Sequence, residues 1–198
     1  MKVFSQSLLA VAMLFGMAAA ATSQSAEVPR FADDFSTSAL LAELWKTTPP
    51  DRWKVADGVL GVSGGGASAA PKGLQVDGPV AVSFRMRVGD FGKGNNWVGA
   101  NVRGILFSLT PGGFWHVYRS PAQERSLGGI QTTERPETGR WYAFRIEQDG
   151  DRYRWLVDGA VVADFREPNV VRGSDGLVSL ASSGPQADYD DISPPEDR

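Results

Sequence analysis

Apolar and polar residues alternate along several short stretches of the chain. In AVSFRMRV, residues 81–88, the apolar positions are Val82, Phe84, Met86 and Val88, and the positions between them are Ala81, Ser83, Arg85 and Arg87. A period of two is typical of a β-strand with one face on a core and the other toward solvent. We therefore expect a strand here, with both arginines on its outer face.

Comparable patterns cover most of the remaining chain. Residues 152–165, RYRWLVDGAVVADF, contain two strand-like runs joined by Asp158-Gly159, a pair that favours a tight hairpin turn. The one helical pattern, residues 36–46, predicts one or two turns that end before the prolines at 49 and 50. Further strands are expected at residues 96–109, 114–120, 141–148, 176–184 and 187–193.

The spacing of these segments indicates the fold class. Strands recur at intervals of roughly ten residues, and most of the 23 glycines and 12 prolines lie at the joints between them. Such a series predicts an all-β antiparallel sandwich or barrel with at most one short helix near the N-terminus.

The first 26 residues are predicted to be a leader rather than part of this fold. Lys2, an apolar run from Leu8 to Ala21 and the small residues that follow have the order of a secretory signal peptide. The run is too short for a membrane anchor, and no later stretch reaches the roughly 20 apolar residues that a spanning helix needs. We expect cleavage between residues 21 and 26, leaving residues 27–198 as a single domain exported to a bacterial periplasm or the extracellular space.

The composition of the chain excludes several kinds of catalytic site, metal site and binding partner. The chain has no cysteine and one histidine, which excludes thiol catalysis, iron–sulfur clusters and multi-histidine metal sites. Loss of Lys2 with the leader lowers the formal charge from −3 to −4, and an acidic chain is a poor match for nucleic acid. Neutral or polar partners such as sugars are expected, and we expect the domain to be a monomer.

Five stretches occur in an order that resembles a known family: FADDFS, WKVADGVLGVSG, NNWVGANVR, GRWYAFRIEQDGDRYRWLVDGAVV and ADYDDIS. The order is similar to that of the concanavalin A-like lectin/glucanase sandwiches, and most like that of the 3-keto-disaccharide hydrolase family, formerly a domain of unknown function. The resemblance runs from Phe31 to Ile192. It implies a jelly roll of two curved sheets, cleavage of the glycosidic bond of 3-keto-disaccharides, and no required cofactor. The same sandwich also serves lectins, lyases and passive modules.

Side chains on the concave sheet of such a fold are the candidates for sugar binding. With the valines and the alanine of NWVGANVR buried, the outward residues are Trp97, Asn101 and Arg103, joined by Arg85 and Arg87 from the strand at 81–88. Aromatic faces stack on pyranose rings, and guanidinium and amide groups pair with vicinal hydroxyls. The alternative is that these arginines only keep a sheet face soluble.

The segment FWHVYRS, residues 114–120, holds the only histidine, and its alternation has two interpretations. If Trp115 and Val117 are buried, His116 and Tyr118 face outward beside the arginines; the opposite alternation turns them toward the core. We favour the first, which makes Tyr118 a substrate-binding candidate. A lone histidine on a strand is more often structural than catalytic, because catalysis needs a nucleophile or an orienting carboxylate within reach.

A 3-keto group acidifies the neighbouring C–H bond, so cleavage can proceed by proton abstraction and elimination. This chemistry needs one base and one group that stabilises the enolate. His116 or Glu124 is the candidate base, and Arg103 is the candidate stabiliser. The carboxylates of the family 16 glucanases, E-x-D-x-x-E, have no match, because the run that begins at Glu147 lacks the last glutamate. Without catalysis, the same face would serve a lectin-like carbohydrate-binding module, or would be idle in an envelope structural domain.

Two acidic clusters, Asp33-Asp34 and Asp188 to Asp191, lie near the two ends of the domain. The first and last strands of such sandwiches are often neighbours, and repulsion between acids would favour a cation. Calcium prefers oxygen ligands, so Asp190 is the first candidate ligand for a structural calcium. The alternative is that these acids cap strand ends or are solvated.

Overall fold

The computed structural model describes residues 31–74, 78–91, 96–110, 114–119, 126–131, 136–168 and 177–193. In the strands at 114–119 and 126–131 it describes the backbone and, of the side chains, that of Val117. Within these residues, no helix is long and apolar enough to cross a membrane.

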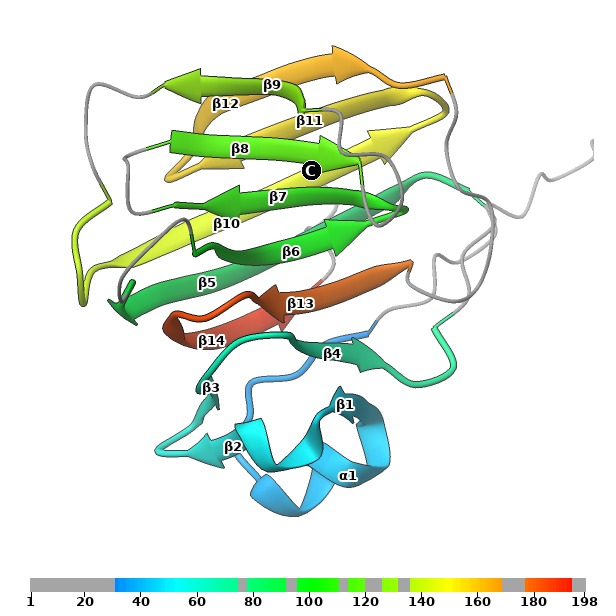
Figure 1. Ribbon diagram of the computed structural model, residues 1–198. Coiled ribbons are helices and arrows are strands. Elements are labelled where there is room, and N and C mark those ends of the chain that lie inside the picture. The colour runs from blue at the N-terminus through cyan, green and yellow to red at the C-terminus, as the bar shows by residue number, and fades with distance from the viewer. Residues whose placement is uncertain are drawn as a thin grey trace, which may run out of the picture.

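Two seven-stranded antiparallel sheets lie face to face (Figure 1). The first sheet has the order β1 (Trp45–Thr48), β4 (Ala67–Pro71), β13 (Val178–Ser182), β6 (Val98–Val102), β7 (Ile105–Leu109), β8 (Phe114–Arg119), β9 (Ser126–Gln131). The second has the order β12 (Ala160–Arg166), β11 (Arg152–Val157), β10 (Trp141–Asp149), β5 (Val80–Asp90), β14 (Gln186–Ser193), β3 (Val59–Val62), β2 (Trp53–Ala56). The prediction of an all-β jelly-roll sandwich is confirmed.

The helical content is small, as the sequence predicts. A 3₁₀ turn, η1 (Ser38–Leu40), leads into α1 (Leu41–Leu44), and a second 3₁₀ turn, η2 (Pro50–Arg52), follows β1. None of the α1 side chains is buried. The apolar face of residues 36–46 instead contributes through Trp45, which is buried on β1.

The alternation in residues 81–88 produces β5 at the centre of the second sheet. Val82, Phe84, Met86 and Val88 are all buried in the core. The hairpin prediction is also confirmed, because Asp158 and Gly159 join β11 to β12 with φ angles of 49° and 80°. Both residues are in the left-handed region, which a two-residue hairpin turn requires.

The stretch 96–109 does not form one strand, as the sequence pattern suggested, but two. Arg103 and Gly104 turn the chain between β6 and β7, with φ angles of 46° and 76°. A glycine that follows an apolar run and precedes another is the turn signal that the longer apolar pattern obscures. Arg103 therefore lies in a hairpin turn and not on a strand face.

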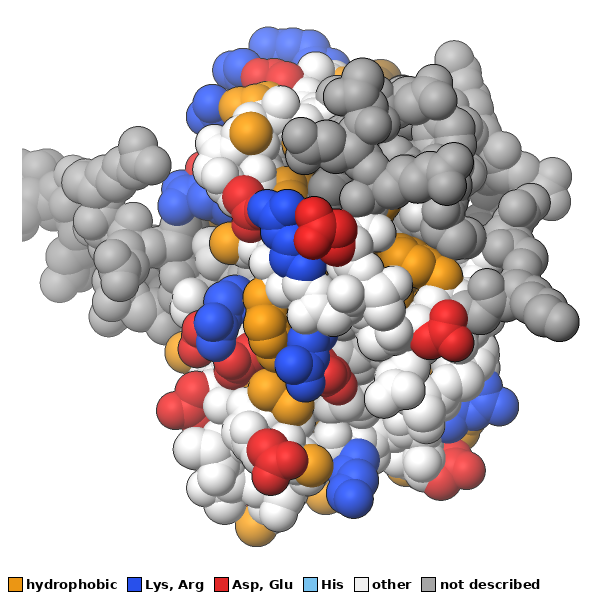
Figure 2. Space-filling view, turned by 90° about the vertical axis from the view of Figure 1, so that its left-hand side faces the viewer, with side chains coloured by type: hydrophobic (Ala, Val, Ile, Leu, Met, Phe, Trp, Pro, Cys, Tyr) orange, Lys and Arg blue, Asp and Glu red, His pale blue; other side chains and the backbone are white. Residues whose placement is uncertain are grey.

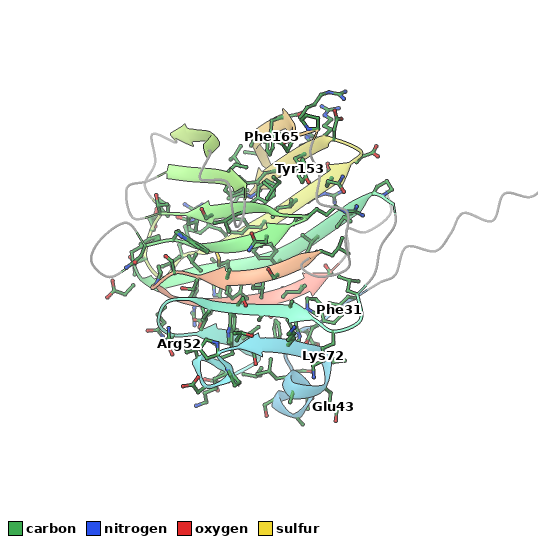
Figure 3. All side chains as sticks on the ribbon, turned by 45° about the vertical axis from the view of Figure 1, so that its right-hand side comes forward. Phe31, Glu43, Arg52, Lys72, Tyr153 and Phe165 are labelled. Carbon is green, nitrogen blue, oxygen red and sulfur yellow. The ribbon has the colours of Figure 1, made fainter. Side chains whose placement is uncertain are left out.

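Aromatic rings fill the space between the sheets. Phe144 stacks on Phe84 with ring centroids 5.0 Å apart. Phe144 also stacks with Trp155, at a centroid distance of 6.0 Å. Tyr153 and Phe165 stack at 5.4 Å, at the end of the sandwich opposite Phe31 and Lys72 (Figure 3). Burial of rings of this size supplies most of the hydrophobic stabilisation of such a core.

One buried hydroxyl connects the two sheets. Tyr189 on β14 places its hydroxyl 3.1 Å from the Gly99 carbonyl oxygen and 3.2 Å from that of Ala181, on adjacent strands of the first sheet. Burial raises the pKa of Tyr189 above its usual value, so the hydroxyl keeps its proton and donates it to this pair. The contact sets the position of β6 and β13 over β14.

The ends of the domain meet, as predicted. Asp33 and Ile192 form an antiparallel bridge in which each backbone N–H donates to the other residue's carbonyl, over 2.9 Å and 3.1 Å.

Candidate functional site

Charged residues separate almost completely between the two sheets. The strands of the first sheet contain two, Lys46 and Arg119, and the seven described strands of that sheet contain no Asp or Glu. The strands of the second sheet contain fourteen: Lys54, Arg85, Arg87, Asp90, Arg145, Glu147, Asp149, Arg152, Arg154, Asp164, Arg166, Asp188, Asp190 and Asp191. The two outer faces therefore offer a ligand very different surroundings.

The arginines of β5 are ion-paired on the outer face of the second sheet. Arg87 Nε lies 2.7 Å from Asp188 Oδ2, and Arg85 reaches both Asp190 and Asp191, over 2.5 Å and 2.7 Å. Both guanidinium groups also lie over the Trp141 ring, at 5.3 Å and 4.9 Å from its centroid. Ion pairs and a cation–π contact thus occupy Arg85 and Arg87.

Further ion pairs lie on this sheet and beside it. Figure 2, which views the molecule from one side rather than onto an outer face, shows Lys and Arg side chains next to Asp and Glu side chains. Arg140 lies 3.0 Å from Asp158, and Arg145 lies 2.6 Å from Glu147. A lattice of balanced pairs keeps a sheet face soluble and leaves no net charge to attract an ion.

The placement of Arg85 and Arg87 beside the other candidates was wrong. Both lie on the second sheet, whereas Asn101 and the Arg103 turn belong to the first. Alternation along a strand shows which residues share a face of that strand, but it does not show which sheet the strand joins. Their assignment as substrate-binding residues loses its geometric basis.

We expect the substitution Arg152→Ala to raise the pKa of Asp164. Arg152 Nε and Nη2 donate to Asp164 over 2.9 Å and 2.7 Å, and these hydrogen bonds hold the pKa of Asp164 below its usual value. Because the folded-state pKa is lowered, the pair stabilises the fold above the unfolded carboxyl pKa, and this stability is lost as the pH falls through the folded-state pKa. A carboxyl-carbon NMR titration measures the change. Arg140→Ala, which leaves this pair intact, is the control, and an unchanged Asp164 pKa in Arg152→Ala would contradict the pairing.

The outer positions of the first sheet are small and uncharged. The register aligns Ser68 with Ala181, Ala181 with Gly99, and Gly99 with Ser108, across four strands. In the next row Ser179 lies opposite Asn101, and Asn101 lies opposite Leu106. We call this set the uncharged face: Ser68, Gly99, Asn101, Leu106, Ser108, Ser179 and Ala181.

Exposure divides the uncharged face into two parts. Gly99, Leu106, Ser108 and Ala181 are buried, and Leu106 and Ala181 stand outside the core cluster between the sheets. Ser68, Asn101 and Ser179 are half-buried. The described polar groups nearest to solvent on this face are therefore the two serine hydroxyls, on β4 and β13, and the Asn101 amide on β6, whose oxygen is itself buried.

Asn101 is the central polar group of this accessible part. Its Nδ2 lies 3.5 Å from Ser179 Oγ, at the long limit of a hydrogen bond. Its Oδ1 has no hydrogen-bond partner among the residues that the structure describes. Since Oδ1 is itself buried, a ligand hydroxyl can accept a hydrogen bond from Nδ2 but reaches Oδ1 only if the side chain turns.

Trp97 and Arg103 lie at the two ends of β6. The Trp97 backbone N–H donates to Ser183 Oγ over 2.6 Å, which joins the start of β6 to the end of β13. Arg103 Nη2 donates to the Gly78 carbonyl oxygen over 2.7 Å, and its backbone N–H donates to Leu177. These contacts give both residues a structural role, and their functions in binding and catalysis remain predictions.

The backbone of β8 brings two further candidates next to the uncharged face. His116 lies opposite Ser108 in register, and Tyr118 lies opposite Leu106. Val117 between them is buried, as the favoured alternation predicts. The side chains of His116 and Tyr118, and the whole of Glu124, lie outside the described residues, so their roles stay predictions.

The candidate calcium ligand has a cationic partner. Asp190 pairs with Arg85, and Asp33 accepts hydrogen bonds from Trp45 Nε1 over 2.7 Å and from the Phe35 N–H over 2.8 Å. A hollow of about 490 Å³ nearby is lined by Ala32, Asp33, Asp34, Leu44, Asp191, Ile192 and Ser193. In the described part of the chain, no three or more His, Cys, Asp or Glu residues are grouped so that they could hold a metal. Asp33 thus accepts hydrogen bonds and Asp190 is ion-paired, and the role of Asp190 as a calcium ligand stays a prediction.

Sequence reasoning missed two features of the site. Trp141 was assigned no role, although both guanidinium groups of β5 lie over its ring. The small residues Ser68, Gly99 and Ala181 also went unnoticed, because their alignment depends on pairing between strands far apart in the chain. The signal available in the sequence was the absence of charge from several strands.

No protein-family model and no curated protein matches this chain. Among solved structures, it is similar to the carbohydrate-binding module CBM66 from Bacillus subtilis, with a TM-score of 0.63 and 13% identity over 75% of this chain and 92% of that one. A β-1,3-1,4-glucanase (lichenase) derived from a mouse hindgut metagenome matches with a TM-score of 0.61 and 13% identity, over 83% and 98% of the chains. A mutant of the alginate lyase Aly36B, in complex with alginate trisaccharide, matches with a TM-score of 0.60 and 11% identity, over 87% and 100%. This likeness shows the fold alone, an antiparallel jelly-roll sandwich.

Proposed function

We propose that this protein is exported and binds a neutral saccharide on the uncharged face of the first sheet. The observation that carries the proposal is the separation of charge between the sheets: one outer face is an ion-paired lattice, whereas the described strands of the other sheet contain half-buried amide and hydroxyl groups and no Asp or Glu. The similar solved structures support a saccharide ligand, because their names include a carbohydrate-binding module, a glucanase and an alginate lyase; the neutrality of the ligand rests on the uncharged face alone.

The chemistry of the uncharged face suits a neutral sugar. A sugar hydroxyl donates one hydrogen bond and accepts others, which matches the hydroxyls of Ser68 and Ser179 and the Nδ2 donor of Asn101. A neutral ligand also needs no opposite charge when it is removed from water, whereas an unpaired ion would be costly to bury here.

Binding without catalysis is the first form of the proposal. Most glycosidases need two carboxylates about 5–5.5 Å or about 6.5–9.5 Å apart. The described strands of the first sheet contain no Asp or Glu, so they cannot supply such a pair. A lectin-like module needs only the polar contacts.

The second candidate function is cleavage of 3-keto-disaccharides, which one base can catalyse. The base removes the proton next to the keto group, the resulting enolate expels the glycosidic oxygen as that oxygen takes up a proton, and water then adds to the double bond. His116 or Glu124 would be the base, and Arg103 would stabilise the enolate. The position of His116 in register with Ser108 favours this candidate over a carboxylate-pair mechanism.

Product analysis by NMR tests the two forms together. The purified protein is incubated with 3-keto-disaccharides and with the matching unoxidised disaccharides, in calcium and in chelator. We expect line broadening of a sugar without product. Release of a monosaccharide from the keto substrate alone would establish the second candidate instead. The absence of both line broadening and product with every sugar would contradict both candidates.

The substitution Asn101→Ala is expected to weaken sugar binding by about tenfold, because it removes the amide donor from the half-buried part of the face. Isothermal titration calorimetry measures the affinity. Gln186→Ala removes an exposed amide from β14 of the other sheet and is the matched control. Equal affinities in the two variants would contradict the assignment of the site to the first sheet.

A further inference from the structure

Two hairpin turns in the described part of the chain share the same pair of residues and closely similar backbone angles. Asp57-Gly58 joins β2 to β3 with φ angles of 53° and 74°, and Asp158-Gly159 joins β11 to β12 with φ angles of 49° and 80°. Both aspartates are exposed. An Asp-Gly pair can rearrange, because glycine has no side chain to shield its backbone nitrogen from the neighbouring carboxyl group. The two turns therefore allow a comparison in which the surroundings of the carboxyl group differ.

The surroundings of Asp158 hold its carboxyl group in place. Oδ1 accepts a hydrogen bond from the Ala143 N–H over 2.8 Å, and Oδ2 accepts one from Arg140 Nη2 over 3.0 Å. The Asp158 N–H also donates to the Ala143 carbonyl oxygen over 2.8 Å, so β10 holds both the side chain and the backbone of this turn. To approach the Gly159 nitrogen, the carboxyl group would have to break both of its contacts.

Asp57 has no such contacts. Among the described residues, none forms a hydrogen bond or an ion pair with the Asp57 carboxyl group. The strand next to this hairpin, β14, pairs with β3 from Val62 to Leu60 and does not reach the turn. On the other side β2 is the edge of the sheet. The Asp57 carboxyl group is therefore free to approach the Gly58 nitrogen whenever the turn opens locally.

The third Asp-Gly pair of the described residues, Asp149-Gly150, differs in its backbone. Asp149 is the last residue of β10 and lies opposite Arg152 in register. The buried Gln148 donates a hydrogen bond from Nε2 to the Gly150 carbonyl oxygen. These contacts hold the backbone on both sides of the peptide bond, so this pair is not matched to the two turns. The pairs at 77–78 and 175–176 include residues outside the described part of the chain.

We propose that Asp57-Gly58 is a site of spontaneous isomerisation to isoaspartate in the folded protein, and that its contacts protect Asp158-Gly159. The Gly58 nitrogen bonds to the side-chain carbonyl carbon of Asp57, and the hydroxyl of the protonated carboxyl group leaves with the amide proton as water. Water then opens the resulting succinimide ring at the main-chain carbonyl, so that the backbone runs through the Asp57 side chain. The reaction needs no oxidant or reductant. It goes beyond the proposed saccharide binding and does not depend on it.

Isomerisation at this turn would loosen β2. It adds a methylene group to the backbone of a two-residue turn, whose positive φ angles match the hairpin. Trp53 on β2 is buried, and its ring centroid lies 6.2 Å from that of Tyr189. In the described part of the chain β2 pairs with β3 alone, so the turn is the local connection that keeps Trp53 in the core. We expect the isomerised protein to unfold at a lower urea concentration.

Peptide mapping of the stored protein tests the proposal. Cleavage after Lys and Arg places the two turns in separate peptides, 55–72 and 155–166, and chromatography separates isoaspartate peptides from aspartate peptides of the same mass. In mildly acidic buffer, isoaspartate at Asp57 should accumulate at least about tenfold faster than at Asp158. In concentrated urea, where the contacts of Asp158 are lost, the two rates should become similar. Arg140→Ala removes one partner of the Asp158 carboxyl group and should raise the rate there at least about twofold in the folded protein.

Asp57→Glu is the control for the chemistry. Glutamate keeps the charge but would have to close a larger ring, so the new peak of peptide 55–72 should be absent from this variant. Circular dichroism shows whether each variant is folded, and the comparison of the two turns in the unmodified protein does not depend on any variant. Equal rates at Asp57 and Asp158 in the folded protein would overturn the proposal. So would isoaspartate that forms at Asp57 in urea but not in the folded protein, which would show that this turn is protected as well.

Discussion

Replacing Gly99 by alanine should lower the free energy of unfolding by about 3 kcal/mol or more, a loss large enough to leave much of the protein unfolded. A Cβ atom at this position would lie 1.9 Å from the Phe107 carbonyl oxygen and 2.8 Å from the Ser108 Cα. Both are backbone atoms of β7, the strand paired with Gly99, so they cannot move aside as a flexible side chain could. The strands would have to separate at the centre of the first sheet.

Urea denaturation measures this effect, with Gly78→Ala as the matched control. A Cβ at Gly78 would meet no atom within 4 Å, and its φ is not in the left-handed region. The control should therefore stay within about 0.5 kcal/mol of the original protein. If the two alanine variants had the same midpoint, the close approach of β6 and β7 would be wrong, and with it the alignment of the uncharged face.

The substitution Trp155→Ala should cost about 3–5 kcal/mol of folding free energy. Trp155 has no exposed surface, stacks at 6.0 Å on Phe144 and meets Phe107 edge-on at 5.4 Å. Phe107 comes from the first sheet and Phe144 from the second, so the indole fills the space between the two layers. Its removal leaves a cavity that neighbours from rigid strands can fill only in part.

Trp141→Ala is the matched control for that substitution. Trp141 lies on the outer face below Arg85 and Arg87, where a cation–π contact contributes about 1 kcal/mol. Equilibrium unfolding in urea should separate the two variants by at least about 2 kcal/mol. Equal losses would contradict the assignment of Trp155 to the core and Trp141 to the surface.

The fold could be predicted because its signals are local. Alternation in residues 81–88 indicates which side chains of β5 are buried. Asp158-Gly159 indicates a hairpin turn, because few other pairs of residues adopt the positive φ angles that this turn has. Neither depends on residues far away in the chain. The sequence also indicated that the first and last segments are neighbours, and the bridge between Asp33 and Ile192 agrees.

The site was harder to predict, because it depends on which strands pair. Arg85 and Asn101 each face outward from their own strand, yet β5 pairs with β10 and β14 while β6 pairs with β13 and β7. These pairings join residues up to 110 positions apart, as for Ser83 and Ser193, and no pattern within a strand encodes them. The role of Arg103 changed for a local reason, since Gly104 allows a turn within an otherwise apolar run.

The most direct test of the proposed site is to locate the sugar on the protein. Backbone amide shifts of the isotopically labelled protein, recorded while a neutral oligosaccharide is added, distinguish the two outer faces. We expect the shifts to change on β4, β13 and β6, around Ser68, Ser179 and Asn101, and to stay constant on β5, β10 and β14. Shift changes centred on the second sheet, around Trp141 and the arginines of β5, would contradict the account. They would show that the sugar binds on the ion-paired face.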